Sequence, residues 1–232
     1  MTRPELILLP GLLCDAALWA PQRDGLNDVA DIRIGDLTQT DSIAAMAARV
    51  LADAPERFAL AGLSMGGYVA FEIMRRAPAR VTRLALLDTS ARPDAPERLQ
   101  QRRDLIRLAQ TGEFRGVTPR LLPQWVHPEN MKDPELVATV TAMTQRVGRD
   151  VFIRQQTAIM GRPDSRPGLV QIRVPTLVLC GRQDQATPVE LAREIAADIP
   201  NARLEVIEQC GHLSTLEKPA AVNRALRQWL AA

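Results

Sequence analysis

The sequence is poor in cysteine and shows none of the cysteine patterns that stabilise small extracellular or metal-bound domains. Its three cysteines, Cys14, Cys180 and Cys210, form no Cys-x-x-Cys pair. Three cysteines cannot all be paired within one chain, so we expect a reducing compartment and predict a cytoplasmic protein. The spacing indicates no zinc site, and we predict no bound metal.

Long apolar runs and long runs of one charge are also missing. The apolar residues 6–9 follow Glu5 and are stopped by Pro10-Gly11, which is not the pattern of a secretory leader or of a membrane span. The net charge of +2 gives no basic footprint of the kind that binds nucleic acid. We therefore expect no nucleic-acid partner and no membrane association.

What is present is an ordinary globular composition with a regular alternation of patterns. With 232 residues, of which 46% are hydrophobic and 24% charged, the chain has room for one substantial α/β domain and an inserted subdomain. Short apolar runs alternate with amphipathic segments, one of which we expect to be a helix capped by Asp41. This order predicts a parallel sheet of about six strands with helices on both faces. The predicted strands cover residues 6–9, 32–34, 58–63, 81–87, 176–180 and 204–207.

The alternation stops between residues 92 and 166, where proline and glycine interrupt several helical segments and no strand pattern occurs. We predict a helical cap here, inserted after the fourth strand, with residues 1–91 and 167–232 forming the core domain. The cap holds 13 Lys and Arg against 9 Asp and Glu. Solvated helix faces explain such a surplus, and a weakly anionic substrate is the alternative.

One short glycine-rich stretch contains a candidate catalytic serine. Gly62-Leu-Ser-Met-Gly66 lies between a predicted strand and a predicted helix, which is the setting of a nucleophile elbow. Glycines there let strand and helix approach closely, and the turn holds the serine in a strained backbone conformation. Ser64 is therefore the candidate nucleophile, although a serine that only caps a helix fits the same pattern.

A serine nucleophile needs a base, and the base needs a carboxylate to orient it. His212 follows the last predicted strand, where loops at the carboxyl ends of parallel strands meet, whereas His127 lies in the cap. Asp184 follows the strand 176–180 and is the first candidate acid; Asp88, at the end of the strand 81–87, is the second. We predict the catalytic set Ser64, Asp184 and His212.

The developing oxyanion needs two aimed N–H donors. The backbone amide of Met65, directly after the nucleophile, is one candidate. The loop after the first strand supplies the other, and we predict the amide of Leu12, with Leu13 as the alternative.

Together these features make the chain resemble the α/β-hydrolase superfamily over essentially its full length. The motifs are Gly62-Leu-Ser-Met-Gly-Gly67, Gly181-Arg-Gln-Asp184 with Pro188, and Gly211-His212 followed by Glu217-Lys-Pro219. The resemblance implies the α/β-hydrolase fold without the first two strands of fuller members. Pro10-Gly11 stands where many members carry His-Gly, and a serine at the elbow separates the chain from dehalogenases and epoxide hydrolases, whose nucleophile is aspartate.

The members that look most similar are small, cofactor-free carboxylesterases, enol-lactonases and carbon–carbon bond hydrolases. The resemblance thus implies a serine hydrolase, without cofactor, that cleaves a small carboxylic ester through an acyl-enzyme. A lactone or β-diketone substrate is the alternative; an acyltransferase, a perhydrolase and a non-catalytic binding protein rank lower. Apolar residues that could line the substrate pocket, or simply belong to the core, are Leu13, Leu121, Leu122, Trp125, Met143 and Met160.

Overall fold

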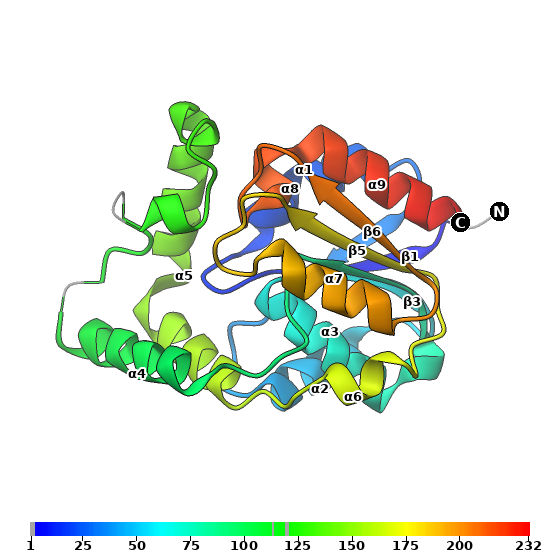
Figure 1. The fold of residues 1–232 in the computed structure, drawn as a ribbon, viewed down its shortest axis with the longest axis horizontal. Coiled ribbons are helices and arrows are strands. Elements are labelled where there is room, and N and C mark those ends of the chain that lie inside the picture. Colours follow the sequence, from blue (N-terminus) through cyan, green and yellow to red (C-terminus); the bar gives the residue numbers. More distant parts are fainter. Residues whose placement is uncertain (1–2, 113, 119–120) are drawn as a thin grey trace.

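The computed structural model describes residues 3–112, 114–118 and 121–232. Its centre is a six-stranded sheet in the order β2-β1-β3-β4-β5-β6 with every neighbouring pair parallel (Figure 1). All six predicted strands are present, and the predicted parallel α/β sheet is confirmed. The strands are β1 Glu5–Leu9, β2 Asp31–Ile34, β3 Phe58–Leu63, β4 Val81–Leu87, β5 Thr176–Gly181 and β6 Ala202–Ile207.

Helices connect the strands and cover both faces of the sheet. The α-helices are α1 Ala20–Leu26, α2 Ile43–Asp53, α3 Met65–Arg76, α4 Pro96–Thr111, α5 Pro134–Met160, α6 Arg166–Leu169, α7 Val189–Asp198, α8 Ser214–Glu217 and α9 Pro219–Ala231. Short 3-10 helices are η1 Ala16–Trp19, η2 Pro78–Arg80, η3 Leu122–Gln124 and η4 Asn130–Lys132. None of the helices in the described part of the chain combines the length and the apolar character needed to cross a membrane.

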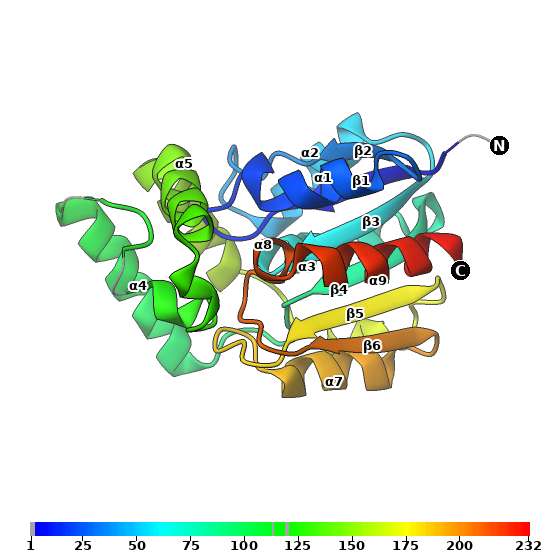
Figure 2. The same cartoon turned by 90° about the horizontal axis from the view of Figure 1, so that it is seen from above.

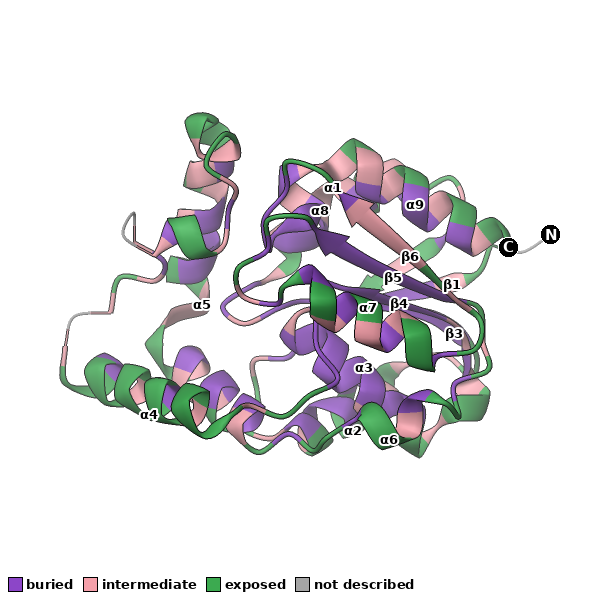
Figure 3. Cartoon of the chain, in the orientation of Figure 1, coloured by how far each residue is buried: buried purple, intermediate pink, exposed green. Residues whose placement is uncertain are grey.

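The alternation of side chains along each strand divides the core into two layers. In β1, Leu6 and Leu8 pack with α1 and α9 on one face, whereas Ile7 and Leu9 pack with α2, α3 and α7 on the other. Because both faces are covered, β3 and β5 are buried at every position (Figure 3). The near-continuous apolar runs in the sequence are the direct result of this two-sided burial.

Besides one-residue extensions of β1, β2 and β5, the cap of α2 and the start of β6 differ from the expectation. The cap of α2 is Ser42 and not Asp41: Ser42 has extended backbone, and its hydroxyl accepts a hydrogen bond from the amide of Ala45 at 3.1 Å. β6 begins at Ala202, two residues before the predicted start, because pairing with β5 continues where the sequence is no longer apolar.

The segment between β4 and β5 is helical, as predicted. Its long helices α4 and α5 lie beyond the carboxyl ends of the strands, to one side of the sheet (Figures 1 and 2). Gly148 interrupts the helical dihedral angles of α5 with a φ of 80°, which agrees with the expectation that glycine interrupts the helices of this segment. The segment therefore stands over the edge of the sheet where the predicted catalytic loops end.

The turn from β3 into α3 is packed more tightly than any side chain would allow. A Cβ atom on Gly62 would overlap the carbonyl oxygen of Gly66, and one on Gly66 would overlap that of Leu9. Gly67 packs in the same way against the side chain of Thr89. These contacts bring the start of α3 against the ends of β1 and β3, and the turn between them carries Ser64.

Gly66→Ala is expected to lower the free energy of unfolding by about 1–3 kcal/mol, since backbone atoms must move to admit the methyl group. Urea denaturation measures the loss. Gly168→Ala is the matched control, because a Cβ at Gly168 has open space and should be neutral or slightly stabilising. Equal stability of the two variants would contradict the tight packing of the turn.

Candidate active site

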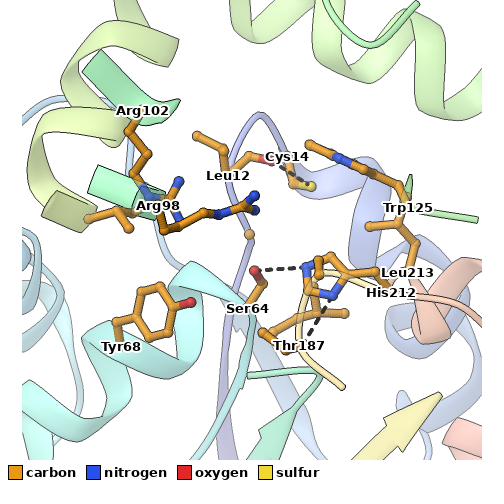
Figure 4. A pocket seen from close by; sticks show the side chains of 14 residues that line it. Leu12, Cys14, Ser64, Tyr68, Arg98, Arg102, Trp125, Thr187, His212 and Leu213 are labelled. Carbon is orange, nitrogen blue, oxygen red and sulfur yellow. Dashed lines mark hydrogen bonds between the residues drawn. The ribbon is translucent and has the colours of Figure 1, made fainter. Parts of the chain in front are cut away.

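The structure brings Ser64, His212 and Asp184 into one hydrogen-bonded row. The Nε2 atom of His212 lies 2.9 Å from the hydroxyl of Ser64 (Figure 4). The Nδ1 atom of the same ring lies 2.8 Å from Oδ2 of Asp184. The three residues follow β3, β6 and β5, and thus come from three loops at one edge of the sheet. A row of hydroxyl, imidazole and carboxylate can pass the serine proton to the imidazole and so produce a nucleophile.

Hydrogen bonds within the loop after β5 orient the carboxylate of Asp184 independently of its contact with the imidazole. Its Oδ1 accepts hydrogen bonds from the amides of Ala186 and Thr187 at 2.8 and 2.9 Å, and its Oδ2 accepts one from the Thr187 hydroxyl at 2.7 Å. Bound on both oxygens, the carboxylate has little freedom to rotate. It therefore holds the His212 ring in the orientation that points Nε2 at Ser64.

Electrostatics favour a negative Asp184 beside a basic His212. Burial alone would raise the pKa of Asp184, but the charge of His212 and the hydrogen bonds from His212 and Thr187 outweigh it and lower the pKa. Burial likewise opposes a charged His212, and the Asp184 carboxylate outweighs this and raises the pKa of His212 above its usual 6.5. The imidazole is thus a stronger base than a free histidine.

Ser64 sits in a strained backbone conformation, with φ of 54° and ψ of −114°. Its amide donates to the carbonyl of Leu87 at 2.9 Å, and its carbonyl accepts the hydroxyl hydrogen of Thr89 at 2.8 Å. These bonds to β4 and the loop after it hold the strain in place. The turn consequently points the hydroxyl out beyond the sheet.

The loop after β1 lies beside Ser64, the candidate nucleophile, where an oxyanion donor would be needed. A Cβ on Gly11 would be 3.4 Å from the Cβ of Ser64. The amide of Leu13 already donates to Oε1 of Gln155 on α5 at 2.9 Å, so it is not free to serve an oxyanion. Leu12 lines the pocket, and Met65 is the first residue of α3, where an amide has no partner within its own helix.

A cavity of about 60 Å³ opens at Ser64 and His212. Of the candidate pocket residues, Trp125 lines it, with its ring 6.5 Å from that of His212. Met143 is fully buried in the core, and Leu13 and Leu122 are also core residues. The remaining residues expected at the pocket, which do not line this cavity, are Leu121 and Met160. Apolar spacing along helices therefore identified core positions more often than pocket positions.

The sequence analysis missed two arginines at the pocket. Arg98 and Arg102, one turn apart on α4, line the cavity with Ser64 (Figure 4). The positive surplus of residues 92–166 was the available signal, but it did not distinguish these positions from arginines that face water.

Glu217, noted only as part of a motif, links the histidine loop to the helical segment. Its carboxylate accepts hydrogen bonds from the amides of Gly211 and Leu213 and from the amide of His127. The carbonyl of Trp125 in turn accepts the amide hydrogen of His212 at 2.9 Å. His127 thus contributes its backbone to the support of the site, and its imidazole Nδ1 accepts from the amide of Glu129.

Asp88, the second candidate acid, lies close to the row but has other partners. Its Oδ1 accepts from the amide of Gly181 at 2.9 Å, and its Oδ2 accepts from the hydroxyl of Ser214 at 2.5 Å. Asp88, Cys180 and Asp184 have ligand atoms within 4.8 Å of one another, which is a spacing that a metal ion could use. Both carboxylates are occupied by hydrogen bonds, and burial raises the pKa of the Cys180 thiol, which opposes the thiolate that a metal would need.

The chain belongs to the alpha/beta hydrolase family, whose model matches residues 6–225. It is 26% identical over 239 residues to a pimeloyl-[acyl-carrier protein] methyl ester esterase of Vibrio parahaemolyticus, an alignment that covers 90% of this chain and 87% of that protein.

Two solved structures share the whole fold. An esterase from Thermogutta terrifontis is 30% identical with a TM-score of 0.89, over 99% of this chain and 90% of its own. An enol-lactonase from Burkholderia xenovorans is 26% identical with a TM-score of 0.90, over 100% of this chain and 93% of its own. The family and the α/β-hydrolase fold expected from the sequence are thereby confirmed.

The environment of Asp88 predicts a measurable pH dependence of stability. Burial and the charge of Asp184 raise the pKa of Asp88 to about 8, from about 4 in an unfolded chain. A raised folded-state pKa stabilises the fold below the unfolded value, and this stabilisation is lost as pH rises towards 8. Relative to Asp88→Asn, the wild type should lose up to about 1.4 kcal/mol of unfolding free energy per pH unit in this range.

Urea denaturation of both proteins between pH 4 and pH 8 measures this difference. Asp104→Asn, on an exposed position of α4, is the control and should keep the wild-type pH dependence. Parallel stability curves for the wild type and Asp88→Asn would show that Asp88 is ionised throughout.

Proposed function

We propose that this protein is a serine hydrolase that cleaves small carboxylic esters through an acyl-enzyme on Ser64. The observation that carries the proposal is the continuous row from the Ser64 hydroxyl through His212 to Asp184, which opens into a cavity. Neither a helix-capping serine nor a surface histidine needs such a row.

In the first half of the reaction, Nε2 of His212 takes the proton of Ser64 as Oγ attacks the carbonyl carbon of the ester. The negative charge that develops on the carbonyl oxygen is stabilised by the amides of Leu12 and Met65. His212 then gives its proton to the departing alkoxide, which leaves as the alcohol. The acyl group stays on Ser64.

In the second half, His212 removes a proton from water, and the hydroxide attacks the acyl carbon. The acid is released, and the proton on His212 returns to Oγ of Ser64. Asp184 stabilises the imidazolium in both halves without taking the proton. The helical segment 92–166 acts as a cap, since Trp125, Arg98 and Ile159 from it line the cavity.

The relatives support an ester as the substrate. The Vibrio relative is named for hydrolysis of a methyl ester, and the Thermogutta relative is named as an esterase. A lactone is the second candidate, because the enol-lactonase matches the whole of this chain. A lactone is a cyclic ester, so the same row and the same two amides would act on it.

A fluorophosphonate probe tests the nucleophile directly, because it reacts covalently with an activated serine. We expect mass spectrometry to locate one adduct on Ser64. Ser64→Ala should take up no label and should lose at least about 1000-fold in turnover of 4-nitrophenyl butyrate. Ser165→Ala, a buried serine that contacts Arg75 away from the cavity, should keep both properties. A wild type that takes no label and cleaves no activated ester would refute the hydrolase.

The identity of the acid can be tested by two matched substitutions. Asp184→Asn should lower kcat by about 10⁴-fold, because the ring loses both its orientation and the compensating charge. Asp88→Asn should keep most of the activity, since Asp88 contacts Gly181 and Ser214 and not the imidazole. The reverse ranking would make Asp88 the acid.

The pH profile of kcat/KM checks the same assignment. Neutral His212 is the active form, so activity should fall as pH drops through its raised pKa, above 6.5. Removing the Asp184 charge removes the largest of the causes that raise the pKa of His212, so the acid limb of Asp184→Asn should move to lower pH. An unmoved limb would show that another group controls it.

A further inference from the structure

Three arginines, Arg98, Arg102 and Arg162, gather where the helical segment meets the pocket, and two of them share the carboxylate of Asp94. Nε of Arg102 contacts one oxygen of Asp94 at 2.5 Å, and Nη2 of Arg162 contacts the other at 2.7 Å. The side chains of Arg102, Arg162 and Asp94 are each more than nine-tenths buried. Arg102 also donates to Gln156, and Arg162 lies over the ring of Tyr68. Both carboxylate oxygens of Asp94 are therefore paired with an arginine. Because one carboxylate faces more than one guanidinium, the group of arginines keeps a net positive charge.

Arg98 is the third arginine, and most of the N–H donors of its guanidinium have no acceptor among the described residues. Its Nη1 donates to the amide oxygen of Gln101 at 3.1 Å, and within the described residues no carboxylate forms an ion pair with it. Figure 4 shows the side chain reaching from α4 across the mouth of the cavity, with its nitrogen atoms above the hydroxyl of Ser64. Partial desolvation at the pocket and the positive charge of Arg102 lower the pKa of Arg98, so an anion placed here would relieve an unfavourable charge.

We propose that Arg98 forms an anion subsite that binds a carboxylate of the substrate, a short chain away from the ester carbonyl. The proposal rests on the proposed hydrolase function and names its substrate class as acidic esters. A guanidinium presents parallel N–H donors that match both oxygens of a carboxylate. Arg102 adds positive charge one helical turn behind it.

The roles of the other two arginines separate this subsite from structural support. Arg102 and Arg162 are buried and bonded to Asp94, Gln156 and backbone carbonyls, which is how an arginine stabilises a fold. Arg98 lines the cavity from a largely exposed position and has one neutral acceptor. No described carboxylate neutralises it, so its charge at the mouth of the cavity is available to a ligand.

Matched ester pairs test the subsite. The acyl pair is 4-nitrophenyl hydrogen glutarate and 4-nitrophenyl pentanoate, which differ by the terminal carboxylate. The alcohol pair is 4-(butyryloxy)benzoate and phenyl butyrate. In at least one pair, Arg98→Gln should lower kcat/KM for the acidic ester by roughly 10- to 100-fold, because a charge-assisted hydrogen bond is lost. The kcat/KM for the neutral ester of that pair should change by less than about 3-fold.

Two further variants complete the test. Arg98→Lys keeps the charge but not the forked donors, and should recover part of the preference for the acidic ester. Arg103→Gln, an exposed arginine of the same helix, changes the net charge equally and should leave the preference unchanged. The neutral esters report whether each variant is folded and active.

The failures of the two proposals are distinguishable. If the wild type cleaves the neutral esters but Arg98→Gln keeps the wild-type ratio in both pairs, the subsite is overturned and the hydrolase stands. An equal loss on acidic and neutral esters would show that Arg98 supports the site without binding the anion, which also overturns the subsite. If no ester is cleaved and Ser64 takes no label, the hydrolase fails, and the subsite fails with it.

Discussion

The two hydrogen bonds of the His212 ring are the constraint on which the arrangement of the site depends. An imidazole can contact Ser64 and Asp184 at once only if the ends of β3, β5 and β6 are held in fixed relation. A parallel sheet does this, because all its strands end at the same edge and their register is fixed by hydrogen bonding. The side chains of Ser64, His212 and Asp184 are short, so their relative positions depend on the positions of the strand ends that carry them.

The positions with strained backbone lie on the same edge. Among the described residues other than glycine, positive φ occurs at Leu13, Ser64, Asp88 and Gln209, in the loops after β1, β3, β4 and β6. Each such residue costs of order 1–3 kcal/mol, which neighbouring contacts must offset. At Ser64 those contacts are the close approach of glycine backbones and the hydrogen bonds to Leu87 and Thr89. Favourable packing and hydrogen bonding thus offset the cost of holding these loops in strained conformations.

The sequence predicted what is encoded locally. The strands and the order of Ser64, Asp184 and His212 follow from apolar runs, glycines and the ends of those runs. The support of the site could not be predicted in this way, because Gln155 and Glu217 act across long sequence distances on loops that they do not adjoin. Apolar cap residues such as Met143 were misplaced at the pocket, since helical spacing marks a buried face without telling whether protein or ligand covers it.

The helical segment between β4 and β5 has two separable tasks. Gln155 holds the loop of Leu12 and Leu13, and the carbonyl of Trp125 holds the loop of His212, so the segment supports the site from both sides through buried polar contacts. Arg98 belongs to the first turn of α4 and makes no such contact with either loop. A substitution at this turn can therefore change the charge at the mouth of the cavity while the hydrogen bonds that orient His212 stay in place. Under the proposed function, such a division would let one fold keep its chemistry and exchange its substrates, because the arginine proposed to select the ligand is not among the residues that hold Ser64 and His212.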